Sequence, residues 1–428
     1  MDTESKPWPF PLRVLFRFLF CYSVLYMLPA HGTANLLSSV PGTSWLTQPY
    51  VKLWDGVETW VAIHIFHLSG EFTHRFPTGS GDTTLDYIIA LCNIVVSFVG
   101  LAIWSILGRR QMEYRRLHAW LRLFIRYTLG TAMLGYGFAK LFPLQFGTPG
   151  FARLLEPYGE FSPMGSLWWF MGASLPYIIF TGSAEVLGGT LLFFRRTTTL
   201  GAMVCIAVVS NIVALNFFYD VPVKLYSSHL LLMAVFLVAP DLKRLFRMLV
   251  LNRPVEPVDM SLPRFANRKL RIAAMAVQVL FLGQLYYGEI HGGWQGYQAR
   301  YVHPQHPPLY GAYDVESYVR NGQEVGLEPS RPRKIAVDNA ASLAVRTMDD
   351  TVVRYGSKYD EAHNTITLTQ GKLAPSTLTY SRPDAEHVVL AGKLGPDTVS
   401  ARLKKIDEKK FLLLSRGFHW INERPLNR

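Results

Sequence analysis

Charged residues are scarce in this 428-residue chain, and the scarcity is uneven. Lys, Arg, Asp and Glu make up 17% of the sequence, whereas an average soluble domain has about 25%. Residues 1–299 contain long charge-poor runs, while residues 300–428 have the composition of an ordinary soluble domain. This contrast predicts a membrane-embedded region followed by a separate domain, with the boundary near Trp294–Pro308.

Cysteine and the common catalytic motifs are also scarce. The three cysteines, Cys21, Cys92 and Cys205, all lie in apolar runs and none belongs to a CxxC pair, so we expect neither a disulfide framework nor a dithiol redox motif. The sequence has no Gly-x-Ser-x-Gly element and no HExxH motif. It lacks zinc-finger and basic-zipper patterns, so the net charge of +12 does not predict nucleic-acid binding.

Seven apolar segments approach the roughly 20 residues that a helix needs to cross a bilayer. They are Leu12–Leu28, Leu85–Leu107, Trp120–Phe142, Leu167–Phe194, Leu200–Phe218, Tyr226–Ala239 and Ile272–Ile290. Pro176 is expected to kink the fourth segment. The sixth is the weakest because its apolar core stops at Pro240, and it would either continue as an amphipathic helix through Leu249 or be re-entrant. The predicted fold class is an α-helical polytopic membrane protein of about seven transmembrane helices with a C-terminal β-rich soluble domain.

The basic residues favour one orientation of these segments. If the N-terminus lies in the cytoplasm, the inner side holds nineteen Lys and Arg residues and the outer loops hold five. Cytoplasmic loops carry an excess of Lys and Arg, so the asymmetry predicts a cytoplasmic N-terminus. Seven crossings then place residues 300–428 in the periplasm or at the cell exterior, and we expect a multi-pass protein of the bacterial inner membrane in contact with the lipid bilayer.

The first outer loop shows structure of its own. Val51–Ile65 has helical apolar spacing and predicts an amphipathic helix on the outer leaflet, with Trp54 and Trp60 among the lipid headgroups. Asp82 or Thr83 is the expected N-cap of the second span.

The C-terminal domain begins after a linker rich in Pro and His and is predicted to be β-rich. Its later part alternates polar and apolar residues in the manner of strands. The expected strands are Thr365–Thr369, Leu378–Tyr380, His387–Leu390, Val399–Leu403 and Phe411–Leu414. Four or five antiparallel strands, arranged as a small barrel or sandwich, are the simplest prediction.

Ionisable residues inside the predicted spans are costly to bury and are therefore functional candidates. At about 1.5 Å per residue, Arg126 lies roughly 9 Å from the inner end of its span and Glu185 roughly 14 Å from the inner end of the next one. An Arg side chain is long enough to span this difference in depth, so Arg126 and Glu185 are predicted to form a buried ion pair. The pair would either fix the register of two helices or serve a proton or a ligand.

A second group of polar residues is predicted near the outer surface. It comprises Lys140, Asn216, Asp220, Tyr226 and His229, which come from three spans and share a depth. Lys140 lies about 30 Å from the inner end of its span, which predicts that it is too far from Glu185 for a direct salt bridge. Such a cluster would hold a quinone ring, a polar headgroup or an anion, or it would anchor helix ends in the headgroups.

His64 and His67 are weak candidates for metal binding. They lie three residues apart, about one helical turn, so both would face the same way, but two histidines are only half a metal site. Packing at the membrane interface is the plainer interpretation, and no metal is expected.

Short motifs in the third to sixth spans resemble those of a known family. The motif residues are Arg126, Gly130, Gly135, Gly137 and Lys140-Leu141 in the third span, Glu185 and Gly188-Gly189 in the fourth, and His229 and Ala239-Pro240-Asp241 in the sixth. Over residues 118–245 the chain resembles the DoxX-like membrane proteins. The resemblance implies a four-helix bundle core. Some DoxX-like proteins are small subunits of quinone-linked sulfur oxidoreductases, and others support redox maturation.

The resemblance and the composition together predict four regions. They are an N-terminal pair of spans with an outer amphipathic loop (1–117), the DoxX-like four-helix core (118–245), a cytoplasmic loop with the seventh span (246–299) and an extracytoplasmic β-rich domain (300–428). The chain departs from the simple family pattern by the spans on both sides of the core and by the exported domain. It also lacks extracytoplasmic cysteines, which argues against a thiol relay.

Three functions remain open at this point. The first is a quinone-associated subunit of a membrane redox system, with quinone as the cofactor and a redox partner in the membrane. The second is a non-catalytic anchor that presents the β-rich domain to an envelope protein. The third is a small transporter, for which only Pro176 and Pro240 indicate broken helices.

Overall fold

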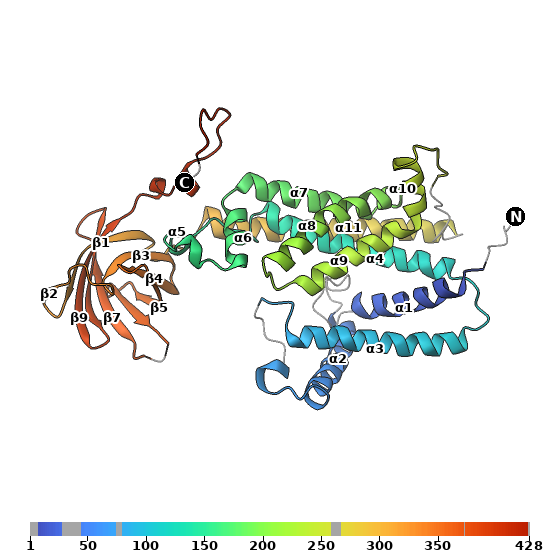
Figure 1. Cartoon of the computed structure of the whole chain (residues 1–428), viewed down its shortest axis with the longest axis horizontal. Helices are drawn as coiled ribbons and strands as arrows, with labels where there is room; N and C mark the ends of the chain where they lie inside the picture. The colour runs from blue at the N-terminus through green and yellow to red at the C-terminus, as the bar shows by residue number, and fades with distance from the viewer. Residues whose placement is uncertain (1–6, 28–43, 74–78, 258–266, 372, 427–428) are drawn as a thin grey trace. The chain divides into compact units, whose positions relative to one another are not determined.

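The computed structural model describes residues 7–27, 44–73, 79–257, 267–371 and 373–426. The chain divides into two compact units (Figure 1). The helical unit contains residues 1–145 and 178–294, and the barrel unit contains residues 146–177 and 295–428. The segment that connects two long helices of the first unit therefore belongs to the second.

Most helices of the helical unit lie roughly along one direction (Figure 1). They are α1 (Phe10–Met27), α3 (Thr84–Leu107), α4 (Arg115–Leu141), α7 (Leu175–Leu192), α8 (Thr198–Phe218), α9 (Lys224–Val238) and α11 (Arg268–Tyr297). Helix α2 (Ser44–His64) lies at a steep angle to α3, and the short helix α10 (Leu242–Leu249) follows α9. The predicted helix over Val51–Ile65 is thus present as part of α2, which ends one residue earlier.

Six helical segments in the described part of the chain are long and apolar enough to cross a bilayer. They are Phe10–Met27, Thr84–Leu107, Leu175–Leu192, Arg195–Phe218, Lys224–Leu249 and Arg268–Val302. The third predicted span forms α4, which is 27 residues long but is not among these six segments, because it is less apolar along its length. Two of its charged residues, Arg126 and Lys140, are buried among neighbouring side chains.

The fourth and sixth predicted spans differ from simple helices. The fourth is two helices, because α6 (Pro163–Gly172) ends before α7 begins at Leu175. Pro176 therefore lies in the first turn of α7, where its missing N–H needs no partner, rather than at a kink. The sixth continues through a 3₁₀ turn and α10 to Leu249, which is one of the two outcomes predicted for it.

Asp82 and Thr83 cap two different helices. Thr83 is the N-cap of α3 and forms a capping box with Asp86. The Asp82 carboxylate instead accepts hydrogen bonds from the backbone N–H groups of Lys224 (2.8 Å) and Leu225 (2.9 Å), which begin α9. One short segment thus connects the starts of α3 and α9.

In the part of the chain that the structure describes, the barrel unit contains nine strands. They are β1 (Gly311–Arg320), β2 (Gln323–Glu324), β3 (Pro332–Asn339), β4 (Ser342–Thr347), β5 (Val352–Asp360), β6 (Thr365–Thr369), β7 (Ser376–Ser381), β8 (His387–Leu394) and β9 (Asp397–Lys405). Neighbouring strands pair in an antiparallel manner, and β1 also pairs with β9. Eight strands therefore close into an antiparallel barrel. The two-residue β2 lies outside this ring and pairs only with β1. Closure removes the unpaired edges of an open sheet.

The barrel interior is packed by alternating side chains of the strands. Tyr313, Val337, Ile366 and Leu403 are among its most buried residues. The β-rich prediction and the barrel alternative are confirmed, but the expected number of strands was too low. The prediction of a strand at Phe411–Leu414 is wrong, because Leu412–Ser415 form the short helix α12.

Candidate functional site

Helices α4 and α7 run antiparallel and meet through glycines at two levels. A Cβ added at Gly137 would lie 2.6 Å from Val186 Cγ2 and 2.9 Å from Gly182 O, and one added at Gly189 would lie 2.9 Å from Gly130 O. The glycines are spaced equally along each helix, so Gly130 faces Gly189 and Gly137 faces Gly182. Without side chains between them, the two backbones approach closely.

Beside this contact, Lys140 and Glu185 form a buried ion pair. Lys140 Nζ donates to Glu185 Oε1 at 2.8 Å and to Oε2 at 2.7 Å. The two side chains are only 8% and 2% exposed. A Cβ on Gly182 would meet Lys140 Cβ at 2.8 Å, so the glycine leaves room for the lysine stem. The carboxylate and the ammonium group thus neutralise each other where α4 and α7 cross.

The predicted pairing of Arg126 with Glu185 is wrong, as is the prediction that Lys140 lies too far from Glu185. Side chains on a helix lean toward the N-terminus of that helix. On antiparallel α4 and α7, Lys140 and Glu185 therefore lean toward each other, while Arg126 leans away. Arg126 Nε donates instead to Leu192 O at 2.8 Å, at the C-terminal end of α7. Free carbonyl groups and the helix dipole favour a cation there.

His229 on α9 packs against two tyrosines of α1. Its ring stacks on Tyr26 with the centroids 3.9 Å apart and the planes 5° from parallel. Its Nδ1 lies 2.7 Å from Leu225 O and its Nε2 lies 2.6 Å from the Tyr22 hydroxyl. A carbonyl oxygen can only accept, so a neutral His229 carries its proton on Nδ1 and accepts the Tyr22 hydroxyl on Nε2. Tyr22 and Tyr26, missed in the sequence, share one face of α1 through their spacing of four.

The other members of the predicted outer cluster have separate partners. Asn216 Nδ2 donates to Ser227 Oγ at 3.0 Å. Tyr226 packs against Tyr136 with ring centroids 6.0 Å apart, and Lys140 Nζ lies 5.7 Å from the centroid of the same Tyr136 ring. Asp220, the remaining member, pairs with Lys224 at 2.9 Å. The structure therefore brings Lys140 and Tyr226 to one tyrosine but does not gather all five residues into a single site.

His64 and His67 do not share a helical face. Helix α2 ends at His64, whose ring stacks on Trp60 and whose Nδ1 lies 2.9 Å from Trp60 O. His67 lies beyond the helix with a φ of 53°. The prediction that one helical turn would align them is wrong, because the helix ends between them. Among the described residues, no group of three or more His, Cys, Asp or Glu side chains is placed to hold a metal ion.

A third set of contacts attaches the segment between α4 and α7 to the barrel. This bridging segment, residues 146–174, contains α5 (Phe151–Leu154), a 3₁₀ turn at Tyr158–Glu160, and α6. Asp338 on β3 accepts hydrogen bonds from the backbone N–H groups of Phe151 (2.5 Å) and Ala152 (3.0 Å), and so caps α5. A side chain of the barrel thus caps a helix of the bridging segment, although the two are far apart in sequence. This contact holds the bridging segment against the barrel.

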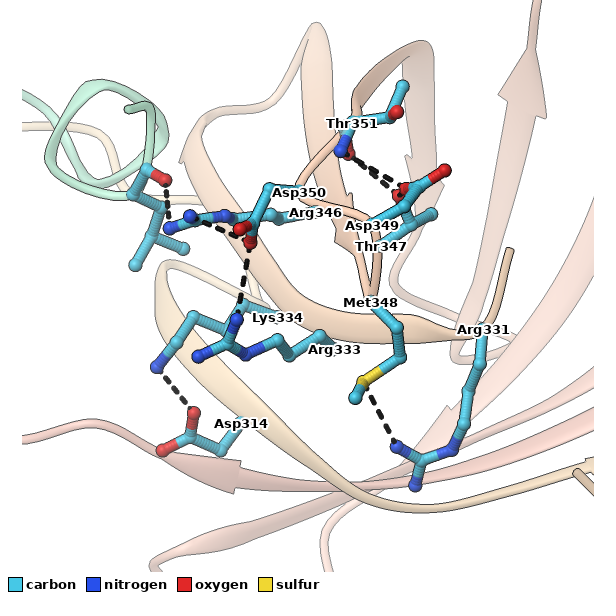
Figure 2. Close-up of polar contacts among 11 residues, drawn as sticks. Asp314, Arg331, Arg333, Lys334, Arg346, Thr347, Met348, Asp349, Asp350 and Thr351 are labelled. Atoms are coloured by element: carbon cyan, nitrogen blue, oxygen red, sulfur yellow. Dashed lines mark hydrogen bonds and ion pairs between the residues drawn. The ribbon is translucent and has the colours of Figure 1, made fainter. Parts of the chain in front are cut away.

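Arginines of the barrel strengthen this attachment. Arg346 Nη1 donates to Leu155 O at 2.8 Å, and Arg346 Nη2 lies 2.8 Å from Asp350 (Figure 2). Asp350 also pairs with Arg333 at 3.2 Å (Figure 2). Because both arginines hold it, the Asp350 carboxylate orients the guanidinium group of Arg346. Arg354 Nη2 lies 3.2 Å from Glu156 Oε2, whose side chain is only 8% exposed. None of these residues stood out in the sequence, because the partners of Arg346 and Arg354 in the bridging segment lie far along the chain.

The turn that carries Asp350 is itself ordered by Asp349. The Asp349 carboxylate accepts hydrogen bonds from Thr347 Oγ1 at 2.5 Å and from Thr351 N at 3.2 Å (Figure 2). These bonds, above all the one from Thr347, lower the pKa of Asp349 below its usual value of 3.8 because they stabilise the charged carboxylate. The turn between β4 and β5 is therefore built around an ionised side chain.

Part of the chain is similar to a known bacterial protein. The uncharacterized protein YwoB of Bacillus subtilis (strain 168) is 31% identical over 152 residues, which are 35% of this chain and 92% of that relative. The chain belongs to the YwoB family. The match is longer than residues 300–428, so it includes residues that precede the barrel strands. No protein-family model matches the chain, and no solved structure matches it significantly.

Proposed function

We propose that this chain is a multi-pass protein of the bacterial inner membrane whose DoxX-like core, residues 118–245, anchors the eight-stranded barrel at the outer face. In this proposal the chain is a non-catalytic scaffold, and the barrel is the part that meets an envelope protein. The observation that carries the proposal is that the bridging segment between α4 and α7 is built into the barrel unit.

Chain connectivity supports the number of crossings. The end of α4, the start of α7 and the end of α11 all lead into the barrel unit, so all three belong on one side of the bilayer. An even number of crossings is then required between the end of α4 and the end of α11, and α7, α8, α9 and α11 supply four. A re-entrant α9 would leave three and would divide the barrel unit between the two sides.

Three buried polar contacts in the helical unit support a structural role. Lys140 is paired with Glu185, Arg126 with the last carbonyl of α7, and Asn216 with Ser227. Each contact joins neighbouring helices or helix ends, which is what fixing the register of a bundle requires. Groups that satisfy one another in this way need no ligand to offset the cost of their burial.

The scaffold role is tested by photo-crosslinking in living cells. A photoreactive residue at the exposed barrel position Ala385 should give a discrete adduct with an envelope protein, whereas one at Glu256, in the predicted cytoplasmic loop, should not give the same adduct. A set of exposed barrel positions that yields no adduct would contradict the scaffold role.

A quinone-associated redox subunit is the second candidate, and the observation that favours it is the aromatic group around His229. A neutral imidazole stacked on Tyr26 and bonded to Tyr22 provides aromatic surface and a proton-exchanging group in one place. Quinone extracted with the gently purified protein, and lost in His229→Gln without loss of folding, would establish this function. A lipid extract without quinone would remove it.

A further inference from the structure

The barrel unit contains a cavity of about 330 Å³ that the scaffold role does not use. It lies between the bridging segment and the residues that follow the last barrel strand. Its walls include Arg153, Leu154, Phe161 and Trp169 from the bridging segment, and Lys410–Leu413 from the C-terminal segment. The volume falls in the range of small-molecule sites, about 300–1,000 Å³.

The lining is mostly apolar, but one polar group in it is unsatisfied. Trp169 Nε1 is buried and has no hydrogen-bond partner among the described residues. A buried indole N–H usually finds an acceptor. An acceptor oxygen on a ligand in the cavity would supply the missing bond.

The cations at the cavity differ in their availability. Arg153 pairs with Glu156 and lies 5.8 Å from the Trp169 ring centroid, so its charge is already engaged. Lys410 is exposed at the cavity and is the second cation that lines it. Immediately beyond, Phe418, Trp420 and Ile421 are 77%, 90% and 78% exposed. Exposed aromatic residues beside cations are typical of segments that lie at a membrane surface.

We propose that this cavity binds the acyl chain of an anionic lipid. The chain lies against Leu154, Phe161 and Leu413, a carbonyl oxygen accepts the Trp169 N–H, and the anionic head pairs with Lys410. Free fatty acids and anionic phospholipids share this chemistry. The lipid would come from the bilayer that the proposed function assigns to the chain. A chain that has the expected topology but retains no lipid would therefore contradict the lipid site and leave the proposed function standing.

Native mass spectrometry of the full chain, released from mild detergent, tests the site. We expect the wild type to retain one anionic lipid, whose mass tells a fatty acid from a phospholipid. Trp169→Phe keeps the ring but removes the donor, and Lys410→Gln removes the cation, so each should lower the retained fraction by about five-fold. Leu413→Asp places a charge against the acyl chain and should abolish retention.

Lys409→Gln is the matched control, because Lys409 shares the same short turn but does not line the cavity. It should retain lipid like the wild type. Equal retention in Trp169→Phe, Lys410→Gln and the wild type would overturn the proposal, since the lipid would then bind elsewhere, and so would a wild type that retains none. Trp169→Phe and Lys410→Gln test the lipid site even if Leu413→Asp fails to fold.

Discussion

Lys140 and Glu185 hold two charges among apolar side chains, and each depends on the other. Removing one partner leaves the other buried and unpaired, which costs about 3–5 kcal/mol. We predict that Glu185→Ala lowers the free energy of unfolding by about this amount, and that Glu185→Gln is milder because an amide oxygen still accepts from Lys140. Thermal or denaturant unfolding of the purified protein in detergent measures both.

Double variants separate the true partner of Glu185 from Arg126. Lys140→Ala combined with Glu185→Ala should cost much less than the sum of the two single changes, because they remove the same contact. Arg126→Ala combined with Glu185→Ala should be close to additive. Strong coupling between Arg126 and Glu185, with additivity for Lys140, would contradict the ion pair described here.

Asp349 adds a pH dependence to the barrel unit. Its pKa is lowered in the folded chain by the hydrogen bonds from Thr347 and Thr351, so its stabilising effect is present above the unfolded-state pKa and is lost as the pH falls through the lower folded-state pKa. We predict that the unfolding temperature falls on acidification from about pH 5 to about pH 2, and falls less in Asp349→Asn. Differential scanning fluorimetry across this range is the measurement, and identical profiles for the two proteins would contradict the prediction.

Residue types in the helical unit were predictable, whereas their partners were not. Arg126, Lys140, Glu185 and His229 stand out because charged and polar groups are rare in apolar segments. Depth along two helices was insufficient to pair them, since side-chain lean toward each N-terminus decides which groups meet. That rule, applied to an antiparallel α4 and α7, would have selected Lys140.

At the scale of elements, the glycine contact between α4 and α7 sets their separation. A methyl group at Gly137 would collide with Val186 and with the backbone of Gly182. We predict that Gly137→Ala destabilises the protein by about 1–3 kcal/mol, the usual cost of overpacking. Unfolding in detergent measures the loss.

Gly283 is the matched control for this change. It lies in α11 with no atom within 4 Å of an added Cβ, so Gly283→Ala should be neutral or should stabilise by about 0.5–1 kcal/mol. If Gly137→Ala were as harmless as Gly283→Ala, the two helices would not be in backbone contact.

Elements with strong periodic signals were predictable, and those without them were not. Long apolar runs located α1, α3, α8 and α11, and the third predicted span, Trp120–Phe142, located α4 apart from its first turn, which begins at Arg115. The early strands escaped notice because β3 and β5 carry charged residues at outward positions and few large apolar residues. A short run of apolar residues fits a strand or a helix equally well, which is why residues 411–414 were assigned wrongly.

At the scale of the whole molecule, the bridging segment belongs to the barrel unit although it connects two helices of the helical unit. Asp338 caps α5 through two backbone N–H groups, and loss of such a cap typically costs about 1 kcal/mol. We predict that Asp338→Ala speeds hydrogen exchange of residues 151–155 while the barrel strands keep their protection. Asp314→Ala, which removes an exposed pair with Lys334, is the control and should leave that exchange unchanged.

This attachment could not be predicted from composition or periodicity. Asp338 meets Phe151 across 187 positions of sequence, and no local pattern marks either residue. The composition shift near Trp294–Pro308 indicated a separate C-terminal domain, but not that an earlier loop would belong to it.

The proposed function is tested most directly by measuring on which side of the membrane each segment lies. With Cys21, Cys92 and Cys205 replaced by Ala, single cysteines at Glu160, Ala385 and Glu256 can be labelled with a membrane-impermeant maleimide in cells with an intact inner membrane. We predict that Glu160→Cys and Ala385→Cys are labelled, and that Glu256→Cys is labelled only after lysis. Labelling of Glu256→Cys in intact cells, or absence of labelling at Glu160→Cys or Ala385→Cys, would contradict this topology.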